Sequence, residues 1–268
     1  MHVPTAPSTP GNREAENMSE HSLRARKWPK RLAIAMLAVI IAAVVGFFAY
    51  TSDYYRPGEI AAGLSEELAA SGNLHETNVG ITLGEADAEV GIVLYPGAKV
   101  DPRAYVPLAQ ELASKGYYCV IAKMPFNLAF FGIDAASGLM EAAPGVHEWW
   151  IAGHSLGGAM AAQFASTHAD ELGGVLLLAA YAATDLSASG LTVETAYGSN
   201  DGVLNRDALE QNAANLPSGS RTDVIEGGNH AGFGDYGPQN GDGENALGAR
   251  AQWQETAALV MQTVETAA

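Results

Sequence analysis

The amino-acid sequence predicts an α/β domain in which a mostly parallel β-sheet is flanked by helices. From residue 78 onward, short segments with the periodicity of strands alternate with helical segments. The apolar run GGVLLLAAY at residues 173–181 suits a central parallel strand that is buried on both faces. Hydrophobic residues make up 48% of the 268 residues, enough for a large core, and no internal repeat or sharp compositional break divides the chain from residue 78 onward. Residues 78–268 are therefore expected to form one domain.

The elements of this domain follow from local patterns. Residues 101–116 are expected to be a helix, because Tyr105, Leu108 and Leu112 recur at helical spacing and Gly116 can end it. The small residues of 156–169 suit a helix that lies close to a sheet, and residues 126–144 have a looser pattern. The expected strands are residues 78–85, 89–95, 117–122, 146–153, 173–181, 191–198 and 221–227. The other expected helices are residues 57–70, 205–216 and 247–265.

An uncharged run precedes the domain. Residues 32–50, LAIAMLAVIIAAVVGFFAY, are 19 residues without a charge. As a helix they span roughly 28 Å, about the thickness of one hydrocarbon core. Five basic residues crowd the N-terminal side of the run between Arg24 and Arg31, whereas the first basic residues beyond it are Arg56 and Lys99. The positive-inside rule predicts a single-pass helix in the cell membrane, with the N-terminus in the cytoplasm and the domain outside it.

The segments on either side of this run have different characters. Residues 1–31 are expected to be a disordered cytoplasmic tail, and residues 51–77 a juxtamembrane linker with one short helix. A cleavable signal peptide is the alternative to a retained anchor. Its apolar region would be about 7–15 residues long and would end in small residues. The observed run is longer and ends in Phe47, Phe48 and Tyr50, which favours the retained anchor.

The charge distribution excludes one class of partner. Residues 1–31 carry a net charge of +3, and the rest of the chain carries −19. Nucleic-acid binding requires a basic surface that displaces counterions, so no nucleic-acid partner is expected. Cys119 is the only cysteine, which excludes an intrachain disulfide framework and a cysteine-based zinc site.

The clearest motif is Gly153-His154-Ser155-Leu156-Gly157, which matches G-x-S-x-G between a predicted strand and a small-residue helix. So sharp a turn holds the serine in a strained conformation and requires residues without bulk at Gly153 and Gly157. The pattern can also be plain backbone architecture, but the strand and helix on either side favour a nucleophilic Ser155. We interpret His154 as a structural residue, because its position on the turn points its ring away from Ser155.

A serine nucleophile requires a base and a carboxylate that orients the base. His230 is the only histidine after the last predicted strand, in the flexible setting Gly-Gly-Asn-His-Ala-Gly. Asp201 follows the strand at 191–198, at the carboxyl edge of the sheet where catalytic groups collect. Asp185, which follows the preceding strand, is the alternative acid.

With these motifs, the chain from about Asn78 to Thr263 resembles the α/β-hydrolase superfamily. It is most similar to the small, lidless bacterial members grouped with the dienelactone-hydrolase-like and fold-5 hydrolases. The matching segments are residues 95–98 (YPGA), 123–128 (KMPFNL), the Ser155 turn, residues 198–202 and Asn229-His230. The resemblance implies the α/β-hydrolase fold and a triad of Ser155, Asp201 and His230. The dienelactone hydrolases use cysteine as the nucleophile, so their substrate does not carry over.

The strand-to-helix turn at Ser155 also predicts which groups surround the substrate carbonyl. The oxyanion hole is expected to consist of the N–H groups of Leu156 and Ala98, although Tyr-Pro-Gly-Ala can also be a simple turn. Only about ten residues lie between Tyr181 and Leu191, so no cap domain is expected. Met124 and Phe126 belong to an apolar loop cluster that is either a substrate-binding wall or ordinary core.

The remaining expectations concern ligands and function. The loop at residues 232–245 contains Asn240-Gly241-Asp242-Gly243, but the first position of a calcium loop would fall on Pro238, so we expect no metal and no cofactor. The sequence therefore predicts a membrane-anchored serine hydrolase that acts on a small-molecule acyl ester. An acyltransferase with the same triad, or a silent hydrolase-fold binding module on the surface, are the alternatives.

Overall fold

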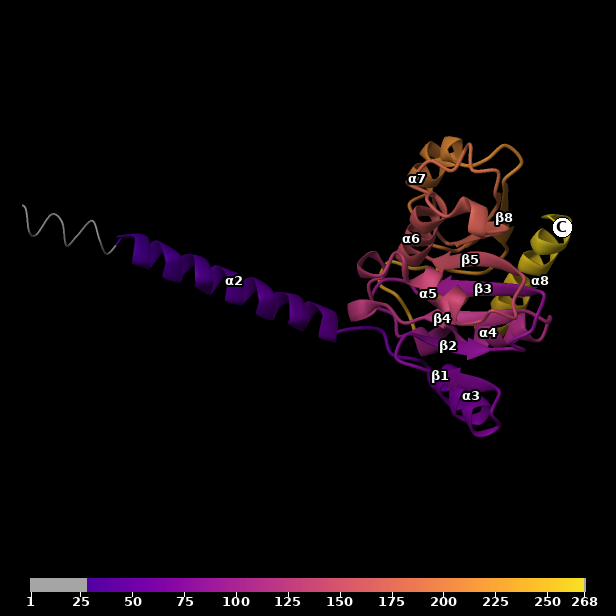
Figure 1. Cartoon of the computed structure of the whole chain (residues 1–268), viewed down its shortest axis with the longest axis horizontal. Coiled ribbons are helices and arrows are strands. Elements are labelled where there is room, and N and C mark those ends of the chain that lie inside the picture. Colours follow the sequence, from indigo (N-terminus) through magenta and orange to yellow (C-terminus); the bar gives the residue numbers. More distant parts are fainter. Residues whose placement is uncertain (1–27, 268) are drawn as a thin grey trace, which may run out of the picture. The chain divides into compact units, whose positions relative to one another are not determined.

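The computed structural model describes residues 28–267, which belong to two units that meet between Ser52 and Asp53 in the chain (Figure 1). The described part of the first unit is helix α2 (Trp28–Ser52). Its segment Lys30–Ser52 is long and apolar enough to cross a membrane, a test that a signal sequence also passes. Residues 28–31 are helical and so do not belong to a disordered tail, and the expectation for residues 1–27 lies outside the described residues.

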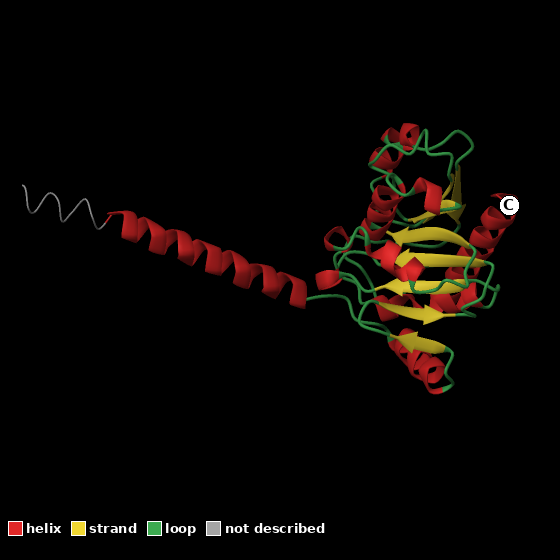
Figure 2. Ribbon diagram, in the orientation of Figure 1, coloured by secondary structure: helices red, strands yellow, loops and turns green. Residues whose placement is uncertain are grey.

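The second unit is built on one eight-stranded sheet with the order β1-β2-β4-β3-β5-β6-β7-β8 (Figure 2). The strands from β4 to β8 in this order pair in parallel, and β1 and β2 are antiparallel additions at one edge. The bounds are β1 (Leu74–Glu76), β2 (Gly80–Leu83), β3 (Val90–Tyr95), β4 (Tyr118–Ala122), β5 (Glu148–His154), β6 (Gly174–Leu178), β7 (Thr192–Gly198) and β8 (Arg221–Ile225). The mostly parallel α/β architecture predicted from the sequence is confirmed.

Helices cover both faces of this sheet, because alternate residues of its inner strands point to opposite sides. Ile92 and Leu94 of β3 belong to the core cluster that includes α4 and α8, whereas Val93 and Tyr95 belong to the cluster that includes α5 and α6. β6 is buried along its whole length, as its apolar sequence predicts. The helices are α3 (Glu59–Ala70), α4 (Val106–Ala113), α5 (Ala135–Glu141), α6 (Leu156–Ala165), α7 (Arg206–Gln211) and α8 (Ala249–Ala267). Short 3-10 turns are η1 (Pro102–Tyr105), η2 (Pro125–Asn127), η3 (Ala129–Phe131), η4 (Ala169–Glu171), η5 (Ala213–Asn215) and η6 (Ala231–Phe233).

The domain begins earlier than the sequence predicted. Residues 53–77, which we expected to be a linker, belong to the compact unit and contribute β1 as well as α3. Long-range contacts explain the difference: Asp235 accepts a hydrogen bond from the Ala61 N–H at 2.7 Å, and β1 pairs with β2. No local pattern reports such contacts. The looser segment 126–144 likewise contains α5, and residues 179–191 between β6 and β7 contain no helix or strand that could form a cap.

Glu194 of β7 gives this fold a predicted dependence on pH. Its carboxyl is 3% exposed, lies 3.6 Å from the Arg221 guanidinium and accepts a hydrogen bond from Thr263. Burial, together with the neighbouring Asp223 carboxyl, raises the pKa of Glu194 to about 7. The folded state therefore favours the protonated acid. The stabilisation is fully present below the unfolded-state pKa of about 4.5 and is lost as pH rises through about 7.

We predict that Glu194→Gln makes the free energy of unfolding less dependent on pH. Relative to the variant, the wild-type protein should lose up to about 3 kcal/mol between pH 4.5 and pH 8. Urea unfolding at several pH values measures this difference, and Glu226→Gln, which removes an exposed carboxylate, is the control. Parallel pH profiles for the wild type and E194Q would contradict the assignment.

Candidate active site

The turn that carries Ser155 has the geometry that its sequence requires. β5 ends at His154, α6 begins at Leu156, and Ser155 between them has φ 54° and ψ −123°. A Cβ on Gly153 would collide with the backbone of Gly157, and a Cβ on Gly157 would collide with the carbonyl oxygens of Tyr95 and Pro96. The Ser155 N–H donates to the Leu178 carbonyl at 2.9 Å, which fixes the turn to β6. The turn therefore presses against the ends of β3 and β6.

His230 and Asp201 are brought together at the same edge of the sheet. Nδ1 of His230 lies 2.9 Å from Oδ2 of Asp201, and both side chains are buried. Oδ1 of Asp201 accepts hydrogen bonds from the N–H groups of Val203 and Leu204, each at 2.8 Å. Burial opposes ionisation of Asp201, but the bond from His230 and these two N–H groups outweigh it and lower the pKa of Asp201. An ionised Asp201 can thus fix the proton of His230 on Nδ1.

The other ring nitrogen of His230 is available for chemistry. Its Nε2 is buried and makes no hydrogen bond within the described chain. The His154 ring, which adjoins Ser155 in sequence, lies 4.6 Å from the His230 ring between centroids. The structure therefore places the Asp201–His230 pair beside the Ser155 turn. The alternative acid, Asp185, is exposed and accepts a hydrogen bond from the Ser187 N–H in its own turn.

Asp242 holds the backbone around His230, a role that sequence analysis missed. Its Oδ1 accepts hydrogen bonds from the N–H groups of His230 at 3.1 Å and Gly202 at 3.2 Å, and its Oδ2 accepts one from Ala231 at 2.8 Å. This carboxylate joins the loop after β7, which carries Asp201, to the loop after β8, which carries His230. The only sequence signal for this role is an acidic residue in a glycine-rich loop close to His230 in the sequence.

The buried side-chain amide of Gln252 also holds the loop around His230. Gln252 of α8 is fully buried, donates from Nε2 to the Asn229 carbonyl at 2.8 Å, and accepts at Oε1 from the Asn229 N–H at 3.1 Å. A Cβ on Gly232 would collide with the same Gln252 side chain. The glycines around His230 therefore allow its loop to pack closely against α8, beyond allowing it to turn.

Tyr105 and His154 connect His230 to residues 97–101, hereafter the 97–101 loop. The Tyr105 hydroxyl accepts a hydrogen bond from the Gly97 N–H at 2.9 Å and lies 2.8 Å from Nδ1 of His154. Burial, with the neighbouring His230 imidazole, holds the pKa of His154 well below its ordinary value, so His154 is neutral. Our interpretation of His154 as structural agrees with this buried position, but its ring also contacts His230.

The two expected oxyanion donors lie on separate segments, Leu156 on α6 and Ala98 in the 97–101 loop. Leu156 is the first residue of α6, where a backbone N–H has no partner within the helix. In the 97–101 loop, the Gly97 N–H is bonded to Tyr105 and the Lys99 N–H is bonded to the Asn127 carbonyl at 2.7 Å. These two bonds hold Ala98 between them. Gly97, whose N–H is already used, is therefore the poorer candidate for a donor.

The predicted substrate wall divides into two sets. Met124 and Leu128 are 6% and 3% exposed and belong to the core, whereas Phe126 is 42% exposed. Phe130 and Phe131, in the same segment, are also exposed. Within residues 28–267, no group of three or more histidine, cysteine, aspartate or glutamate side chains is placed to hold a metal ion.

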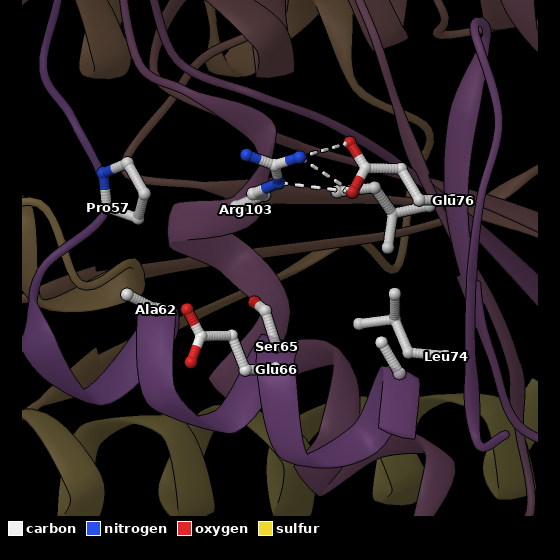
Figure 3. Close-up of a pocket in the computed structure, with 9 residues that line it drawn as sticks. Pro57, Ala62, Ser65, Glu66, Leu74, Glu76 and Arg103 are labelled. Atoms are coloured by element: carbon white, nitrogen blue, oxygen red, sulfur yellow. Dashed lines mark hydrogen bonds and ion pairs between the residues drawn. The ribbon is translucent and has the colours of Figure 1, made fainter. Parts of the chain in front are cut away.

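A separate cavity of about 320 Å³ lies between α3, β1 and η1 (Figure 3). Glu66 and Ser65 of α3 face it from one side, and Arg103 and Glu76 form a bidentate ion pair at another. None of its lining residues belongs to the Ser155, Asp201 and His230 set. It is therefore distinct from the candidate active site.

Comparisons with known proteins agree with this fold. Residues 91–254 match the α/β hydrolase family, and the chain belongs to that family. No curated protein matches the chain. Among solved structures, a CIB-like hydrolase from Thermoplasma acidophilum is 17% identical, with a TM-score of 0.53 over 72% of this chain and 96% of its own. Est1E from Butyrivibrio proteoclasticus is 12% identical, with a TM-score of 0.53 over 72% and 98% of the two chains. A bacterial membrane phospholipase A is 14% identical, with a TM-score of 0.53 over 89% and 99%.

Asp242 provides a test of how the site is held. Asp242→Asn replaces one accepting oxygen with an amide group that cannot accept the backbone N–H groups now bonded to it. We predict a fall in kcat on p-nitrophenyl acetate of about 100-fold, because a small displacement of His230 disturbs proton transfer. Glu244→Gln, which alters an exposed side chain in the same loop, is the matched control. A variant with a lowered Tm and an unchanged kcat would show that Asp242 serves stability alone.

Proposed function

We propose that this protein is a serine hydrolase that acts on an acyl ester through Ser155, His230 and Asp201. The observation that carries the proposal is the buried His230–Asp201 hydrogen bond of 2.9 Å, set beside a serine held at φ 54° on a strand-to-helix turn. A strained nucleophile at a helix N-terminus, with an oriented imidazole nearby, is the arrangement that acyl transfer requires.

The proposed mechanism uses groups of this chain and water. Ser155 Oγ attacks the ester carbonyl and transfers its proton to Nε2 of His230. The N–H groups of Ala98 and Leu156 stabilise the negative oxygen of the tetrahedral intermediate. His230 then protonates the leaving alcohol, and a water molecule resolves the acyl-enzyme by the reverse sequence of proton transfers. Asp201 remains ionised and orients His230 throughout.

The nature of the substrate is supported by two observations. Phe126 presents an exposed apolar ring in the loop after β4, and we propose that it binds the acyl or aryl group, whereas Met124 is buried beneath it in the core. The similar structures include Est1E, described with bound ferulic acid, and the lipolytic enzymes LipS and LipT. Both favour a carboxylic ester with an apolar portion.

We also propose that α2 is a retained membrane anchor, with residues 1–31 in the cytoplasm and the hydrolase domain outside it. The unbroken apolar length of α2 and the basic residues that precede it support this arrangement. The membrane phospholipase A aligns with 89% of this chain, compared with 72% for Est1E, so its similarity extends further along the sequence.

The nucleophile is tested by Ser155→Ala. We predict that this variant folds normally but loses at least about 1,000-fold in kcat on p-nitrophenyl acetate and is not labelled by a fluorophosphonate probe. The control Ser114→Ala, at an exposed helix end, should keep the wild-type turnover of p-nitrophenyl acetate and the wild-type labelling. Labelling of S155A at the wild-type rate would contradict the assignment. Added alcohols distinguish an acyltransferase, because the acyl group would then appear on the alcohol.

The orientation is tested by protease treatment of intact cells. If the five basic residues before α2 remain in the cytoplasm, external protease should remove the hydrolase domain and leave a short membrane-bound fragment. Immunodetection of the two ends of the chain measures the outcome. A domain digested only after lysis would reverse the topology, and a domain released into the medium without α2 would indicate a cleaved signal peptide.

A further inference from the structure

A cluster of exposed phenylalanines lies in one short segment of the hydrolase unit. Phe126, Phe130 and Phe131, hereafter the phenylalanine patch, are 42%, 45% and 46% exposed. Their rings contact one another, with centroids 5.5 Å apart for Phe126 and Phe131 and 4.2 Å apart for Phe130 and Phe131. The other large apolar side chains exposed in the described part of this unit are dispersed over separate elements: Ile60, Val79 and Val224. A gathered aromatic surface of this kind marks an interaction site.

The backbone beneath the patch is held in a strained conformation. Phe126 and Asn127 have φ values of 58° and 54°, which non-glycine residues rarely adopt. The buried side chains of Met124 and Leu128 fix the segment on both sides, and the Leu128 N–H donates to the Pro125 carbonyl at 3.1 Å. The fold thus keeps the aromatic rings at the surface at a cost in backbone energy, which is a feature of functional segments.

The patch is tied to the candidate active site and to the start of the unit through one loop. The Lys99 N–H donates to the Asn127 carbonyl at 2.7 Å, and Lys99 adjoins Ala98, the proposed oxyanion donor. The Lys99 carbonyl in turn accepts from the Tyr55 N–H at 2.7 Å, and the Tyr55 carbonyl accepts from the Asp101 N–H at 2.9 Å. The 97–101 loop therefore has the patch on one side and Tyr55 on the other.

Tyr55 limits how far this loop can lie from the anchor. It follows Ser52, the last residue of α2, by three residues, and three extended residues reach at most about 11 Å. With α2 in the membrane, the loop that borders the site is held near the bilayer surface by the chain itself. A bilayer is therefore the apolar surface that covalent connectivity brings within reach of the patch.

The charges at this edge are compatible with the same partner. Four of the eight basic residues beyond α2 flank these segments: Arg56, Lys99, Arg103 and Lys123. Lys99 pairs with Asp53, and both Arg103 and Lys123 pair with Glu76. This pairing reduces the repulsion between the acidic side chains of this edge and anionic headgroups.

We propose that the phenylalanine patch inserts into the surface of the bilayer that holds α2, and that the Ser155 site takes acyl esters carried by membrane lipids. The inference rests on the proposed function. Ser155 Oγ bonds to the lipid acyl carbon, the lipid alkoxide leaves with the proton from His230, and water then releases the carboxylic acid and restores Ser155. The patch positions the site at the depth where the ester group of a lipid lies.

Insertion is tested directly with a fluorescent label on the full-length protein. Cys119 is buried, so Phe130→Cys and Val224→Cys each supply one accessible thiol for an NBD fluorophore. The labelled proteins are reconstituted in vesicles of phosphatidylethanolamine and phosphatidylglycerol that contain a nitroxide-labelled lipid. We expect quenching of the label at position 130 and none at position 224. Equal quenching at the two positions would overturn the proposal.

The substrate class is tested with a paired activity ratio. In the same vesicles, turnover of a long-chain acyl ester embedded in the bilayer is divided by turnover of soluble p-nitrophenyl acetate. We expect Phe130→Ser with Phe131→Ser to lower this ratio about tenfold, and the control pair Ile60→Ser with Val224→Ser to leave it unchanged. An unchanged ratio in the phenylalanine variant would overturn the proposal, as would loss of a dimer in that variant on cross-linking, which would make the patch an interface between two copies.

Two other results would refute the proposed function itself and are distinct from the outcomes above. A wild-type protein that does not hydrolyse p-nitrophenyl acetate would refute the hydrolase, and one that does not remain with the vesicles on flotation would refute the anchor. When the wild-type protein passes both controls, the quenching and the activity ratio report on the phenylalanine patch alone.

Discussion

The site depends on the close approach of backbone to backbone where β5 turns into α6. Gly153 and Gly157 meet there without side chains, and Gly157 lies against the carbonyl oxygens at the end of β3. Because of this contact, the first turn of α6 lies beside the chain that leads from β3 into the 97–101 loop. A single Cβ at either glycine would force these two segments apart. The strained Ser155 would then no longer lie beside the N–H groups proposed to stabilise the reacting oxygen.

The histidine side of the site is fixed by a different means. His230 lies in a loop with little regular structure, so the half-buried Asp242 and the buried Gln252 replace the backbone hydrogen bonds of a strand or helix. The Asp242 carboxylate and the Gln252 amide hold the backbone N–H and carbonyl groups around His230. Hydrogen-bond networks of this kind are rigid when every partner is present, and removal of one partner destabilises the groups left unpaired.

The 97–101 loop connects these parts to the rest of the molecule. It bonds to Tyr105, and through it to His154, on the core side, and to Tyr55 and Asn127 on the outer side. One short segment therefore links the proposed oxyanion donor, the exposed aromatic segment and Tyr55, the third residue after α2 in the sequence. A change at any of these positions can reach the others through main-chain hydrogen bonds, which leave little freedom for independent movement.

The sequence by itself determined the parallel α/β class, the apolar helix and the turn at Ser155, because periodicity, length and glycine spacing are local properties. It also selected His230 and Asp201 by their order after the strands, and the structure brings these two together. Only the tertiary structure decided that residues 53–77 join the domain, that Asp242 supports His230, and that Met124 is buried while Phe126 is exposed. Each depends on contacts between residues distant in sequence, which no local pattern records.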